Sequence, residues 1–403
     1  MLLLFLLVIP VSCVFAAPAS SRYLFVWAMQ ARHPGIPAMA MKPADISKQH
    51  DEVGLGKDFI AVFDVDPGVS FGNLVAMLPV GDAVQAHHTN YEMPVDGFLY
   101  ANDWLGGDTY VFDLRDPLRP HLARKFAGIG EYSHPHSFVH LPNGNTLATF
   151  QYSGGFNHAA GGLVEFDPKG RVVRTASAIS AEDSNIRPYS LAVDAKDDRI
   201  VTSSADMMAA QVSHVVQVWR LSDLKLLKTL PLPPSPDWYY DTAADSSEPR
   251  LLADGATVVV PTFNCGLFLL QDLASDHPEL KHVYDFGYRG CEVPVIAGDF
   301  MIEAMQSGHA IVSLDLHDPQ HPREVDRILL PPDEYPHWVA LEPGGDRLAI
   351  TGYGGLNTRI RFATIDRRNG KLTLDPAAID MTRTWPDGWR GSAIPHGVVF
   401  GNP

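Results

Sequence analysis

Cysteine and basic residues are scarce in this chain. Only 3 of its 403 residues are cysteine, too few for a scaffold held together by disulfides. The 47 acidic residues outnumber the 31 basic ones and give a formal net charge of −16. A surface of that sign repels phosphate groups, so we expect no nucleic acid and no anionic membrane among its partners.

Long hydrophobic runs are missing apart from residues 1–10, MLLLFLLVIP, which are too few to span a membrane. Ala17-Pro18-Ala19 follows and has the small residues of a signal-peptide cleavage site. We therefore expect residues 1–19 to be a signal peptide. Residues 20–403 are then one exported domain without a membrane span, periplasmic or secreted.

Export leaves two cysteines in the mature chain, Cys265 and Cys291. An oxidising compartment permits a disulfide, but two cysteines do not make a framework, and we expect them to stay unpaired. Three interpretations of Cys265 remain open: a small buried residue, a thiolate ligand or a redox group.

The chain also contains no P-loop and no His-Glu-x-x-His pattern. Its 33 glycines and 32 prolines predict frequent turns, which suits an all-β protein. One element recurs: residues 112–120 (FDLRDPLRP) closely resemble residues 314–322 (LDLHDPQHP), and in both a strand ends at an Asp-Pro turn. Similar strand pairs around a polar turn occur at 59–79, 162–175, 215–231, 266–285 and 359–374.

These seven strand pairs are about 44–60 residues apart, and most follow another pair of apolar runs. Four strands at this period predict the blades of a seven-bladed β-propeller. The expected inner strands start near residues 88, 136, 189, 249, 293, 337 and 396. The last has no outer strands after it, and residues 58–80 have no inner strand before them. We therefore predict that the N- and C-terminal strands close one shared blade, which leaves no open edge.

Proline followed by histidine opens three of the inner runs, at Pro135-His136, Pro336-His337 and Pro395-His396, and Pro188-Tyr189 keeps the pattern with tyrosine. Strands of a blade alternate in direction, so the starts of strands one and three lie on the same face. By this rule eight histidines share one face: His87, His88, His134, His136, His214, His309, His337 and His396.

Imidazoles that converge on a narrow channel form a metal site suited to copper, zinc, iron or nickel. We expect six of the eight to be the metal ligands: His87, His88, His136, His309, His337 and His396. His134 and His214 are candidates to orient these ligands or, together with Tyr91, to move protons. Tyr91 and Trp338 would wall a small apolar pocket; core packing is the alternative for both and is favoured for Trp338.

These residues resemble the selenium-binding protein family, which includes bacterial methanethiol oxidases. The resemblance rests on His87-His88, on residues 133–138 (SHPHSF), on residues 213–219 (SHVVQVW), on Gly308-His309 before a Leu-Asp-Leu-x-Asp-Pro turn, and on His396 near the C-terminus. It covers most of the mature chain, and the order of the motifs in one propeller is more specific than any one of them.

The resemblance implies a copper-dependent oxidase that converts methanethiol, O2 and water to formaldehyde, hydrogen sulfide and hydrogen peroxide. The family's copper-associated histidines carry over most directly onto His87, His88, His136 and His396. Animal members have a cysteine pair shortly after the His-His pair, whereas residues 89–94 (TNYEMP) have none. That departure puts selenium binding and the substrate in doubt. The partners implied are a small thiol and O2.

Two other function classes stay open at this point. A metal-assisted hydrolase, such as a propeller lactonase, would centre Ca2+ on acidic residues, whereas histidines stand at the blade starts here. A binding scaffold without chemistry would have a featureless channel. The sequence leaves the oligomeric state open.

Overall fold

The computed structural model describes residues 22–31, 55–81, 85–103, 106–206, 213–233, 245–288, 290–352 and 358–402. The expected signal peptide, residues 1–19, lies outside these ranges and stays a prediction. In the described part every regular element is a strand, and no helix there is long and apolar enough to cross a membrane.

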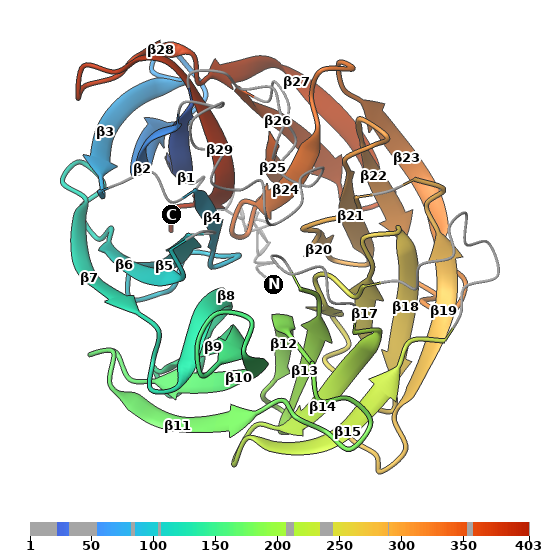
Figure 1. Cartoon of the computed structure of the whole chain (residues 1–403). Coiled ribbons are helices and arrows are strands. Elements are labelled where there is room, and N and C mark those ends of the chain that lie inside the picture. Colours follow the sequence, from blue (N-terminus) through green and yellow to red (C-terminus); the bar gives the residue numbers. More distant parts are fainter. Residues whose placement is uncertain are drawn as a thin grey trace, which may run out of the picture.

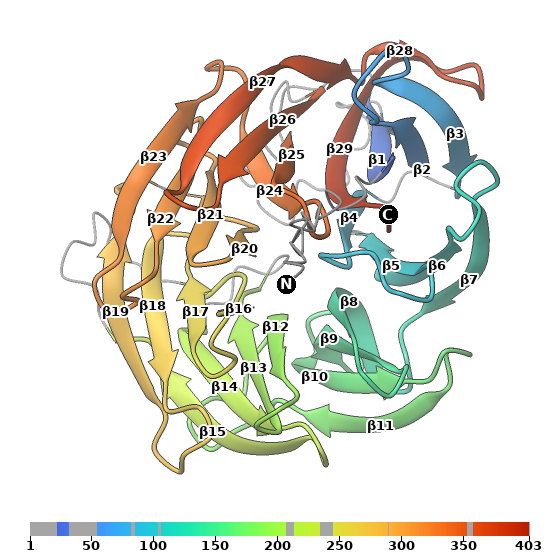
Figure 2. The same ribbon diagram turned by 180° about the vertical axis from the view of Figure 1, so that it is seen from behind.

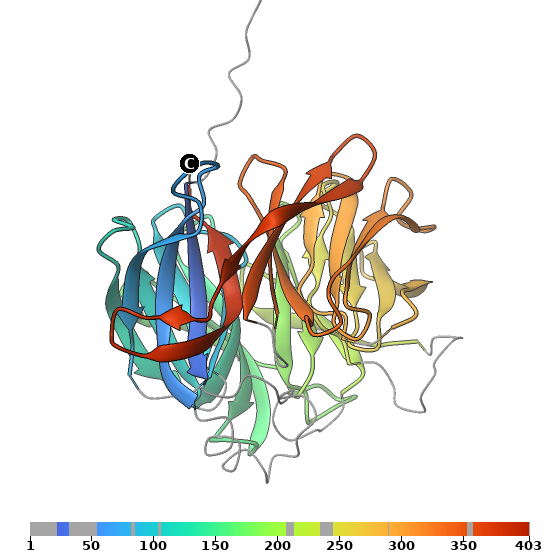
Figure 3. The ribbon, with the colours of Figure 1, turned by 90° about the horizontal axis from the view of Figure 1, so that it is seen from above.

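Seven antiparallel sheets stand around a common axis as blades (Figures 1 and 2). Seen from the side, their strands run between the two faces of a disc (Figure 3). The predicted all-β, seven-bladed propeller is confirmed.

Each blade begins with its inner strand, and the outer strands follow in chain order. The first three blades after the N-terminal strands are β4 (Ala86–Thr89), β5 (Phe98–Asp103), β6 (Asp108–Asp113) and β7 (His121–Ala127); β8 (Tyr132–His140), β9 (Thr146–Ser153), β10 (Ala159–Phe166) and β11 (Val172–Ser177); and β12 (Pro188–Asp194), β13 (Arg199–Ser204), β14 (Val215–Arg220) and β15 (Lys225–Pro231). The next three are β16 (Arg250–Leu251), β17 (Val258–Pro261), β18 (Gly266–Gln271) and β19 (Glu279–Asp285); β20 (Val295–Ala297), β21 (Phe300–Met305), β22 (Ala310–Asp315) and β23 (Arg323–Leu329); and β24 (Pro336–Leu341), β25 (Arg347–Gly352), β26 (Arg359–Asp366) and β27 (Lys371–Asp380).

The seventh blade joins the two ends of the chain, as predicted. Its inner strand is β29 (Arg390–Phe400), and the short β28 (Arg383–Thr384) pairs with the start of β29. The N-terminal part supplies β1 (Tyr23–Ala31), β2 (Leu55–Asp64) and β3 (Asn73–Pro79). Strands β1 and β29 pair antiparallel, with Leu24 opposite Phe400, and lie side by side in Figure 1. Strand β1 was not anticipated, because its near-continuous apolar run shows no alternation.

The core lies between neighbouring blades, where aromatic side chains of one blade pack on the next. Trp27 of β1 is fully buried, and its ring lies 5.3 Å from Tyr110 and 5.4 Å from Phe112 of β6. The Trp27 Nε1–H also donates to the Asn102 carbonyl over 2.7 Å. Burying an indole whose N–H finds an acceptor stabilises the contact between the seventh and first blades.

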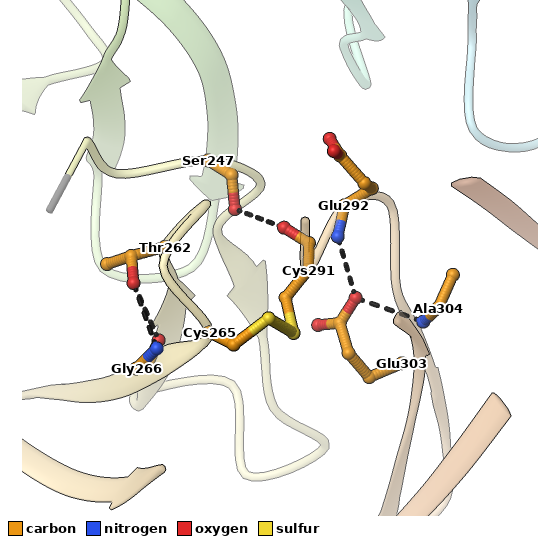
Figure 4. The surroundings of a disulfide bond; sticks show 8 residues. All are labelled: Ser247, Thr262, Cys265, Gly266, Cys291, Glu292, Glu303 and Ala304. Carbon is orange, nitrogen blue, oxygen red and sulfur yellow. Dashed lines mark hydrogen bonds between the residues drawn. A yellow bond between two sulfur atoms is a disulfide. The ribbon is translucent and has the colours of Figure 1, made fainter. Parts of the chain in front are cut away.

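The expectation that the two cysteines stay unpaired is wrong. Cys265, just before β18, and Cys291, just before β20, form a buried disulfide with a Cα–Cα distance of 5.0 Å (Figure 4). The bond links two blades that are consecutive in the chain, so the two cysteines, 26 residues apart in sequence, come together when these blades pack. Cys265 is therefore neither a thiolate ligand nor a free buried thiol.

Candidate metal centre

Five histidines meet at the propeller axis, on the inner strands of four consecutive blades. His87 and His88 lie on β4, His136 on β8, His337 on β24 and His396 on β29, and none is more than 2% exposed. In the remaining blades Tyr189 lies on β12, and Glu248 and Glu292 lie just before β16 and β20. Every blade therefore contributes a polar side chain at this level of the channel.

A β-bulge lies at the histidine positions and at Tyr189, and it turns these side chains inward. In β8 the pairing steps from Pro135 opposite Phe150 to Phe138 opposite Ala148, so His136 and Ser137 face one residue, Thr149. The same shift occurs in β4, β12, β24 and β29. Proline has no N–H to give to the ladder and fits at a bulge. In β24 the Pro-His dipeptide opens the strand, as the sequence predicted, whereas in β8 and β29 it lies inside a longer strand. In all three strands it coincides with a bulge.

In the bulges of β4, β8 and β12, a polar side chain from the second strand accepts a backbone N–H of the bulge. Asn102 Oδ1 accepts the N–H of His88 over 2.7 Å, and Thr149 Oγ1 accepts that of Ser137 over 3.0 Å. The same side chains donate to the next blade, Asn102 to the carbonyl of Pro135 and Thr149 to that of Tyr189. These bonds hold the bulges in register around the ring, and with them the histidines.

The five histidines form two overlapping groups in which one ring nitrogen of each residue lies within 4.8 Å of the others. One group is His87, His88 and His136, and the other is His88, His337 and His396. His88 belongs to both. The Nε2 atoms of His337 and His396 are 2.7 Å apart, and the rings of His87 and His88 stack with centroids 4.2 Å apart.

Burial keeps these imidazoles neutral, which is the form that binds metal. It lowers the pKa of His136 and of His337 to about 3. Burial, reinforced by the neighbouring histidines, also holds the pKa of His87, His88 and His396 well below the usual value. The Nε2 atoms of His88 and His136 are buried without a hydrogen-bond partner among the described residues. The donor set therefore fits a transition-metal ion.

Two fully buried carboxyl groups face the other side of the cluster. Glu248 Oε1 lies 3.6 Å from His88 Nδ1, and Glu292 Oε2 lies 3.6 Å from His337 Nδ1. Burial raises the pKa of both carboxyl groups, and neighbouring carboxylates raise that of Glu292 further. A carboxyl group behind a ligating histidine fixes its ring and tautomer. Sequence analysis gave neither residue a role.

Tyr91 connects to the same network. Its hydroxyl donates to Glu248 and lies 2.8 Å from Ser137 Oγ and 2.7 Å from Ser190 Oγ. Burial, together with the Glu248 charge, raises the pKa of the phenol. Its ring stacks on Trp338, with centroids 5.5 Å apart. Tyr91 therefore reaches the histidines through Glu248.

Three of the candidate histidines lie outside both groups. His309 and His214 precede the third strands β22 and β14. His309 has Nδ1 2.9 Å from the Glu334 carbonyl, and His214 has Nδ1 3.8 Å from Asp245. His134 packs against Tyr152 with centroids 5.2 Å apart, and burial lowers its pKa. Topology predicted that His214 and His309 share a face with the other histidines. They do not join the cluster, because a third strand lies farther from the axis than a first strand.

Comparison with known proteins shows the fold. No family profile matches the sequence, and neither does any curated protein sequence. Among solved structures, a hypothetical selenium-binding protein from Sulfolobus tokodaii is similar at 13% identity and TM-score 0.72, over 94% of this chain and 93% of that one. A 6-phosphogluconolactonase candidate from Bacteroides fragilis is similar at 11% identity and TM-score 0.58, over 96% and 99%. A second such candidate, from Bacteroides uniformis, is similar at 10% identity and TM-score 0.60, over 94% and 99%. All three likenesses are those of propellers.

One hydrolase-like pattern lies far from the histidines. Residues 68–72 read Gly-Val-Ser-Phe-Gly and match the letters of a nucleophile elbow. They form the turn between the outer strands β2 and β3, where Val69 is fully exposed, and the Ser70 hydroxyl bonds Asp64. An elbow needs a strand-to-helix turn with a histidine beside the serine, so this serine is a turn residue.

Proposed function

We propose that this protein is an exported, copper-dependent oxidase of small thiols, with methanethiol, O2 and water giving formaldehyde, hydrogen sulfide and hydrogen peroxide. The observation that carries the proposal is the cluster of five buried, neutral histidines at the axis. The sequence resemblance to methanethiol oxidases adds the substrate class. Export follows from residues 1–19.

The residues of the site divide into those that would bind the metal ion and those that would orient the ligands. His87, His88, His136, His337 and His396 would hold the ion, and Glu248 and Glu292 would fix two of the rings. A bound copper ion would lower the pKa of a thiol and accept electrons from it. Tyr91 is hydrogen-bonded to Glu248 and to two serines. It would pass a proton to or from the metal-binding histidines through Glu248.

The burial of the cluster sets the substrate size. With no histidine more than 2% exposed, only a small thiol can approach the ligand nitrogens. We expect methanethiol to be consumed with O2 uptake and peroxide release, and bulky thiols to react poorly.

Metal analysis and an oxygen electrode test the proposal together. Protein expressed with copper should carry about one copper per chain, because imidazole sites favour Cu2+ among the divalent ions. His88→Ala with His136→Ala should abolish O2 uptake and leave the β-rich circular dichroism spectrum unchanged. His321→Ala, at an exposed outer turn, is the matched control.

Three results would redirect the assignment. Stoichiometric calcium without a transition metal would favour the metal-assisted hydrolase. No bound metal at all would favour a binding scaffold. Fully loaded protein that takes up no O2 with methanethiol or any other small thiol would remove the oxidase activity and leave a metal-binding propeller.

A further inference from the structure

A second site lies at the other end of the channel. A cavity of about 600 Å3 opens where the inner strands end, whereas the histidines lie nearer the starts of the same strands. Its walls are mostly apolar and come from several blades, for example Phe138 of β8, Leu191 of β12, Ile296 of β20 and Leu341 of β24. The volume is within the range of about 300–1,000 Å3 that is usual for small-molecule sites.

The cavity and the histidine cluster are separate sites. Tyr91 and Arg250 line the cavity, and both also contact Glu248, which in turn faces His88. The guanidinium carbon of Arg250 lies 3.9 Å from the centroid of the Tyr91 ring. The side chains of Tyr91 and Arg250 therefore form the boundary between the apolar cavity and the site that contains Glu248 and His88.

Arg250 has hydrogen-bonding capacity left over. Its Nε donates to the Pro294 carbonyl over 2.9 Å, and its Nη1 donates to the Pro249 carbonyl over 3.0 Å and to Glu248 over 3.3 Å. Its Nη2 is buried and has no hydrogen-bond partner among the described residues. The side chain as a whole is 12% exposed. The partly exposed guanidinium lines the cavity, so a ligand oxygen there would add an acceptor to a charged donor that has one nitrogen unpaired.

The remaining charge around the cavity leaves Arg250 as the group that selects a head group. The other charged side chain in its lining is Glu92, which is exposed at the protein surface. Val95, at the same rim, is 88% exposed, so the entrance has an apolar side chain as well. Among the described residues of the lining, Arg250 is the one Lys or Arg side chain, and it also contacts Glu248. An apolar chamber with a cation at its inner boundary matches a molecule that has a hydrocarbon tail and one anionic head.

We propose that this cavity binds an amphipathic monocarboxylate of medium chain length, with its carboxylate on Arg250 and its tail along the apolar walls. The proposal does not depend on the metal or on the oxidase activity. It assigns a ligand to the cavity, which shares Tyr91 of its wall with the proposed reaction.

Isothermal titration calorimetry of the mature full-length chain with decanoate, below its micelle concentration, tests the proposal. We expect micromolar binding of decanoate, and no measurable binding of butyrate, which lacks the tail. Arg250→Met replaces the guanidinium by an unbranched apolar side chain and should lower the affinity for decanoate at least tenfold. Decan-1-ol should bind wild type and Arg250→Met alike, because it has no carboxylate.

A second pair of variants tests the position of the tail. Ala253 lines the cavity and is exposed, so Ala253→Trp should block the cavity and abolish decanoate binding. Ala256, exposed on the same turn and outside this cavity, makes Ala256→Trp the matched control. The proposal fails if decanoate does not bind wild type, if the two tryptophan variants bind it equally, or if Arg250→Met binds it as tightly as wild type. The tryptophan pair keeps the test decisive if Arg250→Met does not fold.

Discussion

Glu303→Gln should make the protein more stable relative to wild type as the pH rises. Glu303 lies on β21, fully buried, and its Oε1 accepts the N–H groups of Glu292 and Ala304, each over 3.0 Å (Figure 4). Its Oε2 has no hydrogen-bond partner among the described residues. Burial raises the pKa of this carboxyl to about 8, from an ordinary value of 4.5.

The sign and the size follow from proton linkage. Between pH 4.5 and 8 the folded chain holds a proton on Glu303 that the unfolded chain has released. The folded state binds more protons, so this group lowers the free energy of unfolding as the pH rises, by about 1.4 kcal/mol per pH unit. Glutamine keeps the shape and the accepting oxygen but does not titrate. The stability difference should therefore move in favour of the variant by about 3 kcal/mol between pH 5.5 and pH 7.5.

Urea unfolding of metal-free protein at pH 5.5, 6.5 and 7.5 measures this difference. Any fixed cost of the added amide group shifts all three values equally, so the slope against pH is the decisive quantity. Glu182→Gln, at an exposed position, should show no such slope. A difference between wild type and Glu303→Gln that is equal at the three pH values would mean that Glu303 is ionised in the folded protein, and the reasoning from burial would be wrong.

Three further predictions concern the network around the site. Replacing Cys265 and Cys291 by serine should cost about 3 kcal/mol in urea unfolding, because the disulfide closes a loop of 26 residues in the unfolded chain, and an unchanged midpoint would contradict this. Glu248→Gln and Glu292→Gln should each lower the affinity for copper about tenfold in a competition titration and shift the electron paramagnetic resonance spectrum of Cu2+. Unchanged spectra would mean that neither carboxyl group orients its histidine. Tyr91→Phe should lower the free energy of unfolding by about 1–3 kcal/mol, because the hydroxyls that it contacts and Glu248 lose a partner, and thermal unfolding that matches wild type would refute this.

The amino-acid sequence by itself determined the architecture. Strand and turn patterns repeat at a regular interval, and each repeat alone cannot bury its apolar faces, so a closed ring of blades was the solution that the pattern allowed. The missing outer strands at one end and the missing inner strand at the other predicted the shared blade. The Pro-His dipeptides marked His136, His337 and His396 on inner strands, which is where the structure has them.

Only the tertiary structure decided which polar residues meet. His214 and His309 were predicted to share a face with the inner histidines, but they directly precede third strands. The pattern of strands along the sequence does not give the distance of a residue from the axis. The disulfide joins residues of different blades, so their proximity depends on how these two blades pack. Glu248 and Glu292 gain their role from histidines on other blades. Local sequence specifies strands and bulges through short-range sterics and hydrogen bonding, whereas the site and the cavity depend on contacts across the axis, which form when the blades close.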